Sequence, residues 1–180
     1  HQIILDRLLD CINLLQNNQL FDDQEKLLIL MQTKAKKMLS WLNTMTFSNG
    51  DIPLFNDATP NIAPTTQELN NYAATLQLKM PFHSMERASS SEGRDSIFKT
   101  LSSGYRKFNT ENYECITNTT PISPSYQPGH AHADTLSFVL YLNQKPFLID
   151  PGISTYEAGS QRSLERGTSF HNTVSLKSLD

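Results

Sequence analysis

The spacing of the hydrophobic residues changes near the middle of the chain. In the first half they recur at steps of three and four, as on one face of a helix, for example at Ile4, Leu8, Ile12 and Leu15. In the second half they fall in short runs separated by turn residues, which indicates strands without intervening helices. The sequence therefore predicts an α+β chain in which helices come first and an antiparallel sheet follows.

The first half is expected to contain three helices. The first runs over residues 3–15 and ends at the Asn17-Asn18 pair, and the second follows Asp22 and continues to Met45. Asp22 and Glu25 have the spacing of a capping box. A short helix is expected from Thr65 or Thr66 to residue 76, after a proline-containing loop over residues 48–65 that is ordered by its own apolar side chains.

The second half is expected to form an antiparallel sheet, with an exposed loop over residues 84–95 before it. Asn143-Gln144 is predicted to be the turn of a hairpin. The predicted strands cover residues 97–101, 105–108, 113–117, 137–142, 146–150 and 172–176.

Composition excludes several classes of protein. Charged residues make up 18% of the 180 residues and the net charge is −3, so no basic excess attracts nucleic acid. No apolar run is long enough to span a membrane. Two cysteines 104 positions apart, Cys11 and Cys115, make neither a disulfide framework nor a four-sulfur metal site. The chain lacks an initiator Met and begins inside a helical pattern, so we expect a fragment of a longer protein.

The segment Gly129-His-Ala-His-Ala-Asp134 carries the strongest chemical signal. On a strand, residues two apart share a face, which would place His130, His132 and Asp134 together. Two imidazoles and a carboxylate suit zinc, and they equally suit acid–base chemistry near neutral pH. The plainer interpretation is a pair of surface histidines beside an aspartate.

Two later segments add to this signal. An apolar run, residues 147–149, ends at Asp150-Pro151-Gly152, and His171 precedes another predicted strand. In isolation, an Asp at a strand end is usually a turn residue, and a single His before a strand is usually structural.

The order of these motifs resembles that of the heparinase II/III-like polysaccharide lyases. The resemblance rests on G-H-x-H-x-D-x-L-S-F at residues 129–138, D-P-G with a nearby Tyr at 150–156, and R-x-x-x-R-G-T-x-x-H-N-T-V at 162–174. Residues 48–57 and 102–105 agree more weakly, as the loop that leaves the family's helical domain and as an early sheet strand.

The resemblance implies the end of an incomplete (α/α) toroid over residues 1–80, followed by part of an antiparallel β-sandwich over residues 81–180, with the active cleft between them. It also implies cleavage of uronic-acid-containing polysaccharide by β-elimination, in which a base removes the C5 proton and the C4 oxygen leaves. The implied partner is an acidic polysaccharide, and the implied location of the parent protein is the periplasm or outside the cell. The particular uronate polymer and the oligomeric state are not specified by the sequence.

The resemblance also implies roles for individual residues. His130 corresponds to the catalytic histidine of the sheet, which neutralises the substrate carboxylate or acts as the base. Zinc with a structural role is implied as the cofactor, and Asp134 is expected to orient a histidine. The implied zinc ligands are His132, Asp150 and His171, and the implied substrate-binding residues are Tyr156, Arg162 and Arg166.

The sequence departs from the family pattern at its beginning. The family's catalytic Tyr and Asn lie on toroid helices, and no residue of this chain corresponds to them, so we expect that this chain alone is not a competent lyase. Two alternatives remain: a non-catalytic glycan-binding or polysaccharide-assembly protein of the same fold, and a zinc-stabilised β domain with an interaction role.

Overall fold

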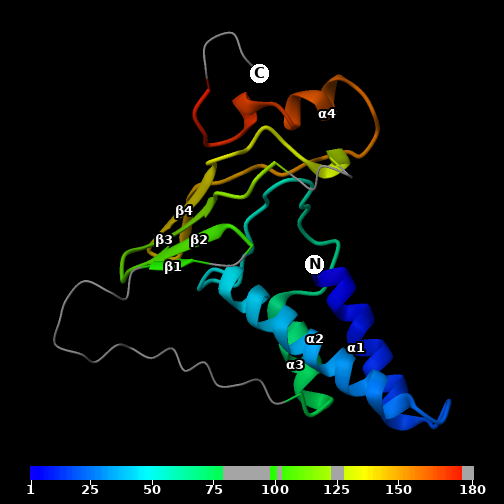
Figure 1. Ribbon diagram of the computed structural model, residues 1–180. Coiled ribbons are helices and arrows are strands. Elements are labelled where there is room, and N and C mark those ends of the chain that lie inside the picture. The colour runs from blue at the N-terminus through cyan, green and yellow to red at the C-terminus, as the bar shows by residue number, and fades with distance from the viewer. Residues whose placement is uncertain (79–97, 101–102, 123–127, 176–180) are drawn as a thin grey trace. The chain divides into compact units, whose positions relative to one another are not determined.

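The computed structural model describes residues 1–78, 98–100, 103–122 and 128–175 (Figure 1). Internal contacts divide the chain into two compact units. The helical unit comprises His1–Thr46 and Asn61–Glu86, and the sheet unit comprises Phe47–Pro60 and Arg87–Asp180. The predicted exposed loop at 84–95 lies outside the described residues.

The helical unit contains α1 (Gln2–Asn17), α2 (Gln24–Met45) and α3 (Thr66–Thr75). All three predicted helices are confirmed, and α1 lies alongside α2 in Figure 1. The buried face of α1 differs from the predicted one, because Ile3 and Ile4 are 49% and 66% exposed. The fully or nearly fully buried side chains of α1 are Leu5, Leu9, Ile12 and Leu15.

The predicted capping box at the start of α2 does not form. The N-cap is Asp23, one residue later than Asp22, and its side chain makes no capping hydrogen bond. Instead, the buried Gln24 amide donates to the carbonyls of Leu15 and Asn18 and accepts from the Leu20 N–H. The connection between α1 and α2 is therefore stabilised by one glutamine side chain.

The start of α3 has a capping box. The Thr65 hydroxyl accepts from the Glu68 backbone N–H at 3.2 Å, and the Glu68 carboxylate accepts from the Thr65 N–H at 2.8 Å. These two bonds satisfy backbone donors that a helix end leaves without partners.

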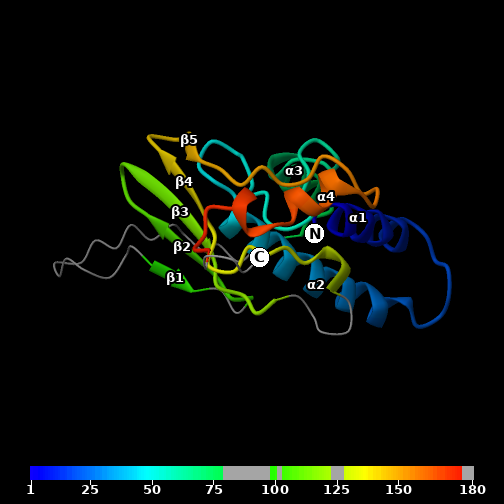
Figure 2. The same ribbon diagram turned by 90° about the horizontal axis from the view of Figure 1, so that it is seen from above.

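The five strands of the described residues form one antiparallel sheet in sequence order (Figure 2). The hairpin predicted about Asn143-Gln144 is confirmed, since both residues adopt the left-handed conformation that such turns require, with φ of 48° and 63°. The strands are β1 (Phe98–Thr100), β2 (Tyr105–Asn109), β3 (Tyr113–Asn118), β4 (Phe138–Leu142) and β5 (Lys145–Leu148).

One face of β3 is buried, because its side chains alternate between interior and exterior. The buried face presents Glu114, Ile116 and Asn118, and Ile116 lies opposite the buried Val139 of β4. The interior of the sheet unit thus contains a carboxylate and an amide as well as apolar groups.

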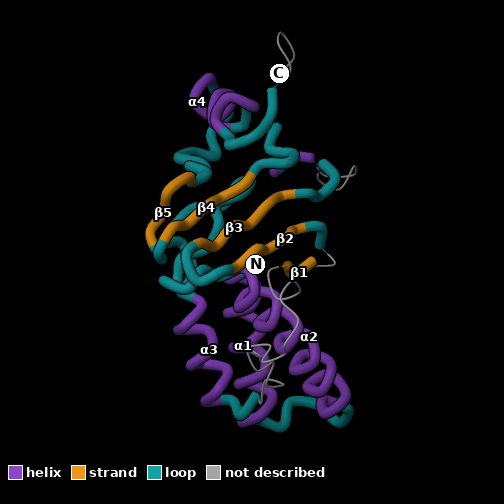
Figure 3. Tube along the Cα trace, turned by 90° about the vertical axis from the view of Figure 1, so that its left-hand side faces the viewer, coloured by secondary structure: helices purple, strands orange, loops and turns teal. Residues whose placement is uncertain are grey.

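The described residues after the sheet, 149–175, form short helices and turns rather than strands. α4 (Ser160–Glu165) lies beyond one end of the strands, as Figures 1 and 3 show. The strand predicted at 172–176 is wrong over its described part, residues 172–175. The Asn172 side chain donates to the carbonyls of Phe138 and Ile149, so a side-chain amide, not a strand ladder, ties this segment to the sheet.

The loop that follows α2 belongs to the sheet unit. The predicted division at residues 80 and 81 groups this loop with the helices, whereas the structure places Phe47–Pro60 with the sheet. Phe47 stacks on Tyr141 with ring centroids 4.0 Å apart, and the Tyr141 hydroxyl donates to Asp51. We call Phe47–Pro60 the connecting segment.

Candidate functional site

Asp57 of the connecting segment is the centre of the candidate site. Its carboxylate is 8% exposed and accepts three hydrogen bonds. Oδ2 lies 2.6 Å from Nδ1 of His130 and 2.9 Å from a terminal nitrogen of Arg162, and Oδ1 lies 2.9 Å from Nε2 of His132. Residues that are 73 to 105 positions away in the sequence therefore share one carboxylate.

These bonds determine the protonation state of Asp57. Burial alone would raise its pKa, but the hydrogen bonds from Arg162, His132 and His130 outweigh burial and lower the pKa to about 2. Asp57 is therefore an anion at neutral pH, and the Arg162 guanidinium balances its charge.

The ionised carboxylate also determines which nitrogens of the two histidines carry hydrogen. A carboxylate only accepts, so His130 donates through Nδ1 and His132 through Nε2. His130 is 67% exposed, and Nε2 is the ring nitrogen that remains for a ligand. The His132 side chain is completely buried.

A second buried carboxylate holds the third histidine. Nδ1 of His171 lies 2.7 Å from Oδ2 of Asp150, and both side chains are almost completely buried. Oδ1 of Asp150 accepts from the Gly152 N–H at 3.1 Å. The residue at the strand end is thus both a turn residue and the partner of a histidine.

The buried imidazoles leave two nitrogens without partners. Within the described residues, neither Nδ1 of His132 nor Nε2 of His171 has a hydrogen-bond partner, and the two ring centroids are 5.3 Å apart. The other ring nitrogen of each imidazole donates a hydrogen bond to a carboxylate. This is the usual arrangement for a histidine that binds a metal.

The donor set fits a metal in part. Two bare imidazole nitrogens suit zinc. However, Asp150 is engaged with His171 and Gly152, and no three His, Cys, Asp or Glu side chains of the described ranges are grouped so as to hold an ion. Asp150 would have to give up its bond to His171 or bind through its remaining lone pairs to become the third predicted ligand.

Comparison with known proteins agrees with this arrangement of motifs. The sequence model of the family described as "Heparinase II/III-like, C-terminal" matches residues 93–180. Residues 93–180 therefore resemble the heparinase II/III-like family. The resemblance read from the motifs is therefore confirmed, and it relates the chain to the polysaccharide lyases.

A solved structure of a heparinase III gene product has a similar fold. The TM-score is 0.59 at 21% sequence identity, and the match covers 98% of this chain and 32% of that one. This likeness confirms the predicted fold class, with toroid helices followed by an antiparallel sheet. The chain thus spans about a third of the length of that heparinase III. None of the curated proteins matches it.

The remaining predicted site residues of this heparinase II/III-like region lie near Asp57. The Tyr156 hydroxyl donates to the Asp57 carbonyl, and its ring lies 5.4 Å below the Arg162 guanidinium. Arg166 donates to the carbonyl of Ala131, between the two histidines of the motif. The roles of Arg162 and Arg166 in sugar binding stay predictions, since both guanidinium groups bond protein atoms.

Asp134 lies in the interior of the sheet unit. It accepts from the Asn118 amide at 2.9 Å. Burial raises its pKa, while the Asn118 hydrogen bond and the nearby His171 and His132 oppose that rise. Its role in orienting a histidine stays a prediction, because its carboxylate accepts its hydrogen bond from Asn118.

The backbone of the motif differs from the predicted strand. Pro128–His130 is a 3₁₀ turn, and residues 131–137 contain no strand. His130 and His132 nevertheless bond the same carboxylate, so they lie together for a reason other than strand alternation. Asp57 itself was missed as a site residue; its only signal was its place in a loop that weakly resembles the family.

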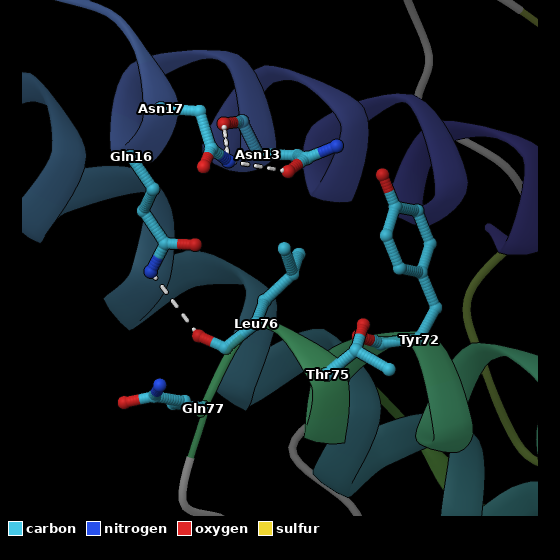
Figure 4. A pocket seen from close by; sticks show the side chains of 7 residues that line it. All are labelled: Asn13, Gln16, Asn17, Tyr72, Thr75, Leu76 and Gln77. Atoms are coloured by element: carbon cyan, nitrogen blue, oxygen red, sulfur yellow. Dashed lines mark hydrogen bonds between the residues drawn. The ribbon is translucent and has the colours of Figure 1, made fainter.

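A separate pocket lies in the helical unit, between α1 and the end of α3 (Figure 4). Its volume is about 540 Å³. Gln16 donates to the Leu76 carbonyl across it, and the Tyr72 hydroxyl donates to Asp10. Tyr72 is the one titratable side chain of its lining, which is otherwise neutral and mainly polar: Asn13, Gln16, Asn17, Tyr72, Thr75, Leu76 and Gln77.

A helix that spans a bilayer needs about 20 predominantly apolar residues. Over the described ranges, none is both long enough and apolar enough to traverse a membrane.

Proposed function

We propose that the chain is part of a lyase that cleaves uronic-acid-containing polysaccharide by β-elimination. The observation that carries this proposal is His130, an exposed imidazole whose Nδ1 is bound to a buried, ionised aspartate and whose Nε2 is left for a ligand. The match of the region that contains it to the heparinase II/III-like family supports the reaction class.

In this mechanism the residues around Asp57 stabilise the negative charge that develops on the substrate. Abstraction of the C5 proton develops negative charge on the uronate carboxyl group, and positioned donors lower the barrier by stabilising that charge. His130 is placed either to donate a hydrogen bond to the carboxyl group or, in its neutral form, to accept the C5 proton. Tyr156, which is 58% exposed, is proposed to contact the sugar.

Substitution of His130 in the full-length protein tests the proposal. A panel of uronate polymers is incubated with each form, and the near-ultraviolet absorbance of the new C4–C5 double bond is recorded. We expect the wild type to give a signal and His130→Ala to lower its rate by about 10²- to 10⁴-fold. The melting temperature serves as the control for folding, since His130→Ala also removes one of the three hydrogen bonds to Asp57.

Two results would contradict this function. Equal rates for wild type and His130→Ala would remove His130 from the mechanism. Binding of acidic polysaccharide by the wild type with no double-bond product on any polymer would favour a glycan-binding or assembly role.

We also propose that zinc binds at His132 and His171, with Asp150 as the third ligand, and has a structural role. The two buried ring nitrogens without partners support the two histidine ligands. To become the third ligand, Asp150 would exchange its bond to His171 for the metal. Bound zinc would supply a cross-link between the segments that carry these histidines. A metal held only by the folded state at 100 times its Kd adds about 2.7 kcal/mol of stability.

Metal removal tests the zinc assignment without measuring activity. We expect a chelator to lower the melting temperature of the wild type and to leave that of His171→Ala unchanged. Elemental analysis is expected to find about one zinc per chain in the wild type only. The site would be refuted if the wild type contained no metal and its melting temperature changed with neither chelator nor added zinc.

The proposed substrate indicates where the protein acts. A lyase for large acidic polysaccharides must meet its polymer outside the cytoplasm, so we propose a periplasmic or secreted location. Fractionation of the source cells, with the protein followed by antibody, would test this.

A further inference from the structure

Three hydrogen-bond donors converge on the Asp57 carboxylate from two separate parts of the chain. Oδ2 accepts from His130 and from Arg162, and Oδ1 accepts from His132. The side chains of Asp57, His132 and Arg162 are 8%, 0% and 12% exposed, whereas that of His130 is 67% exposed. The exposed imidazole is thus the outermost member of a buried network.

Asp57 is held in place from both sides. Before it, Phe55 is buried and stacks on Tyr105 with ring centroids 5.5 Å apart. After it, the Ala58 carbonyl lies against Gly152, where an added Cβ would come within 2.4 Å of the carbonyl oxygen. The Thr59 hydroxyl donates to the Ile153 carbonyl. The position of the carboxylate is therefore determined by its neighbours along the chain as well as by its three donors.

We propose that Asp57 is the positioning residue for His130. It holds the ring in the Nδ1–H tautomer, so that Nε2 points away from the carboxylate toward the ligand. Asp57 also accepts a hydrogen bond from His132, so one carboxylate holds both the exposed ring and the buried ring. The consequence for catalysis rests on the proposed function, whereas the tautomer and the orientation of the ring do not.

The chemistry of the position favours a carboxylate over other side chains. Each oxygen of an ionised carboxylate accepts two hydrogen bonds, so it satisfies three donors without turning a donor toward them. An asparagine of nearly the same shape would place an NH₂ group against at least one of these donors. Asp57→Asn therefore removes the positioning with little change in volume, and Asp57→Glu keeps the acceptor-only group on a longer side chain.

The first test is spectroscopic and independent of lyase activity. Histidine ¹⁵N chemical shifts are measured on the whole protein at a pH well above the ordinary histidine pKa of about 6.5, with the His130 signals assigned by His130→Ala. We expect the wild type to show the Nδ1–H tautomer of His130 and Asp57→Asn to shift it toward Nε2–H. Asp51→Asn is the matched control, because Asp51 lies in the same connecting segment but accepts from Tyr141.

The second test separates positioning from folding and from substrate binding. We expect Asp57→Asn to lower kcat by about 10- to 100-fold with a smaller change in KM, since partners of this kind contribute about that factor. Asp57→Glu is expected to recover part of the loss, and Asp51→Asn to keep the wild-type kcat.

The outcomes distinguish this inference from the proposed function. A wild-type His130 in the Nε2–H tautomer overturns it without any variant, even if Asp57→Asn fails to fold. An unchanged tautomer in Asp57→Asn also overturns it. A third outcome is that the tautomer shifts in Asp57→Asn while the wild type shows no lyase activity on any polymer. That result supports the positioning role and refutes the proposed function.

Discussion

The helical unit and the sheet unit differ in what they bury. Among the described residues, the buried polar side chains of the helical unit are neutral, Gln24 and Thr66. Those of the sheet unit include the ionisable groups Glu114, His132, Asp134, Asp150, Glu165 and His171. Burial of an ionisable group is costly unless a partner compensates for it. The stability of the sheet unit therefore depends on specific pairs of buried polar side chains, whereas that of the helical unit depends on apolar packing.

Both units contain local and long-range hydrogen bonds, and in the sheet unit long-range bonds pair buried ionisable groups. In the helical unit, Thr65 and Glu68 stabilise the start of α3 from three residues apart. In the sheet unit, Glu114 accepts from the Ser48 N–H, 66 residues away, and bonds the Lys107 ammonium at 3.1 Å. Long-range pairs of this kind also assemble the candidate site.

The largest expected effect tests the dependence of the sheet unit on pairs. Glu114→Ala removes a buried carboxylate from Lys107 and from the Ser48 N–H, and we expect it to cost about 3–5 kcal/mol of unfolding free energy. Urea denaturation measures the loss. Glu111→Ala, at an exposed site near the same strand, is the control. An equal loss of unfolding free energy in the two variants would contradict the dependence of the sheet unit on buried pairs.

Apolar packing in the helical unit is expected to give the next effect. Leu9 is completely buried, and Leu9→Ala should cost about 2–5 kcal/mol through lost burial and the cavity left behind. Leu14→Ala, at a 56% exposed position of the same helix, should cost far less. The ¹⁵N shifts of His132 and His171 should not change in Leu9→Ala, and a change would show that the two units are coupled.

A smaller effect is expected from the local capping bonds. Thr65→Ala removes the capping box of α3 and should cost about 0.5–2 kcal/mol, measured as a shift in the denaturation midpoint. Thr65→Ser keeps the hydroxyl and should restore most of the stability. Equal midpoints for the alanine variant and the wild type would mean that α3 does not depend on its cap.

The smallest expected effect is a pH dependence at the same cap. The backbone N–H of Thr65, followed by its hydroxyl, lowers the pKa of Glu68 below 4.5. A lowered pKa in the folded state means that the contribution to stability is present above about pH 4.5 and is lost as the pH falls through the folded-state pKa. Glu68→Gln should remove this dependence, and a melting temperature that falls equally with acid in both forms would refute it.

Much of the fold was readable in the sequence because it depends on short-range regularities. The step of three and four residues indicated α1, α2 and α3, and Asn143-Gln144 indicated the hairpin of β4 and β5. The errors have local causes too: a buried Gln24 replaces the Asp22 capping box, and the Asn172 side chain replaces a strand ladder.

The candidate site was predicted only in part. The segment 129–134 singled out His130 and His132, because imidazole and carboxylate groups clustered in sequence are unusual for a core, and the family resemblance added Asp150 and His171. The structure pairs His171 with Asp150 and joins His130 to His132 through another residue. Asp57 went unrecognised because one aspartate in a polar, proline-containing loop has no local signal of function.

The sequence by itself determined the kinds of element, their order, and the family that residues 93–180 resemble. These depend on patterns within a few residues or on motifs in a set order. Only the tertiary structure decided that Asp57 meets His130, His132 and Arg162, and thereby which nitrogen of each ring is left bare. The physical reason is that a hydrogen bond requires atoms about 3 Å apart. For groups 73 to 105 residues apart, that proximity depends on the path of the whole sheet unit.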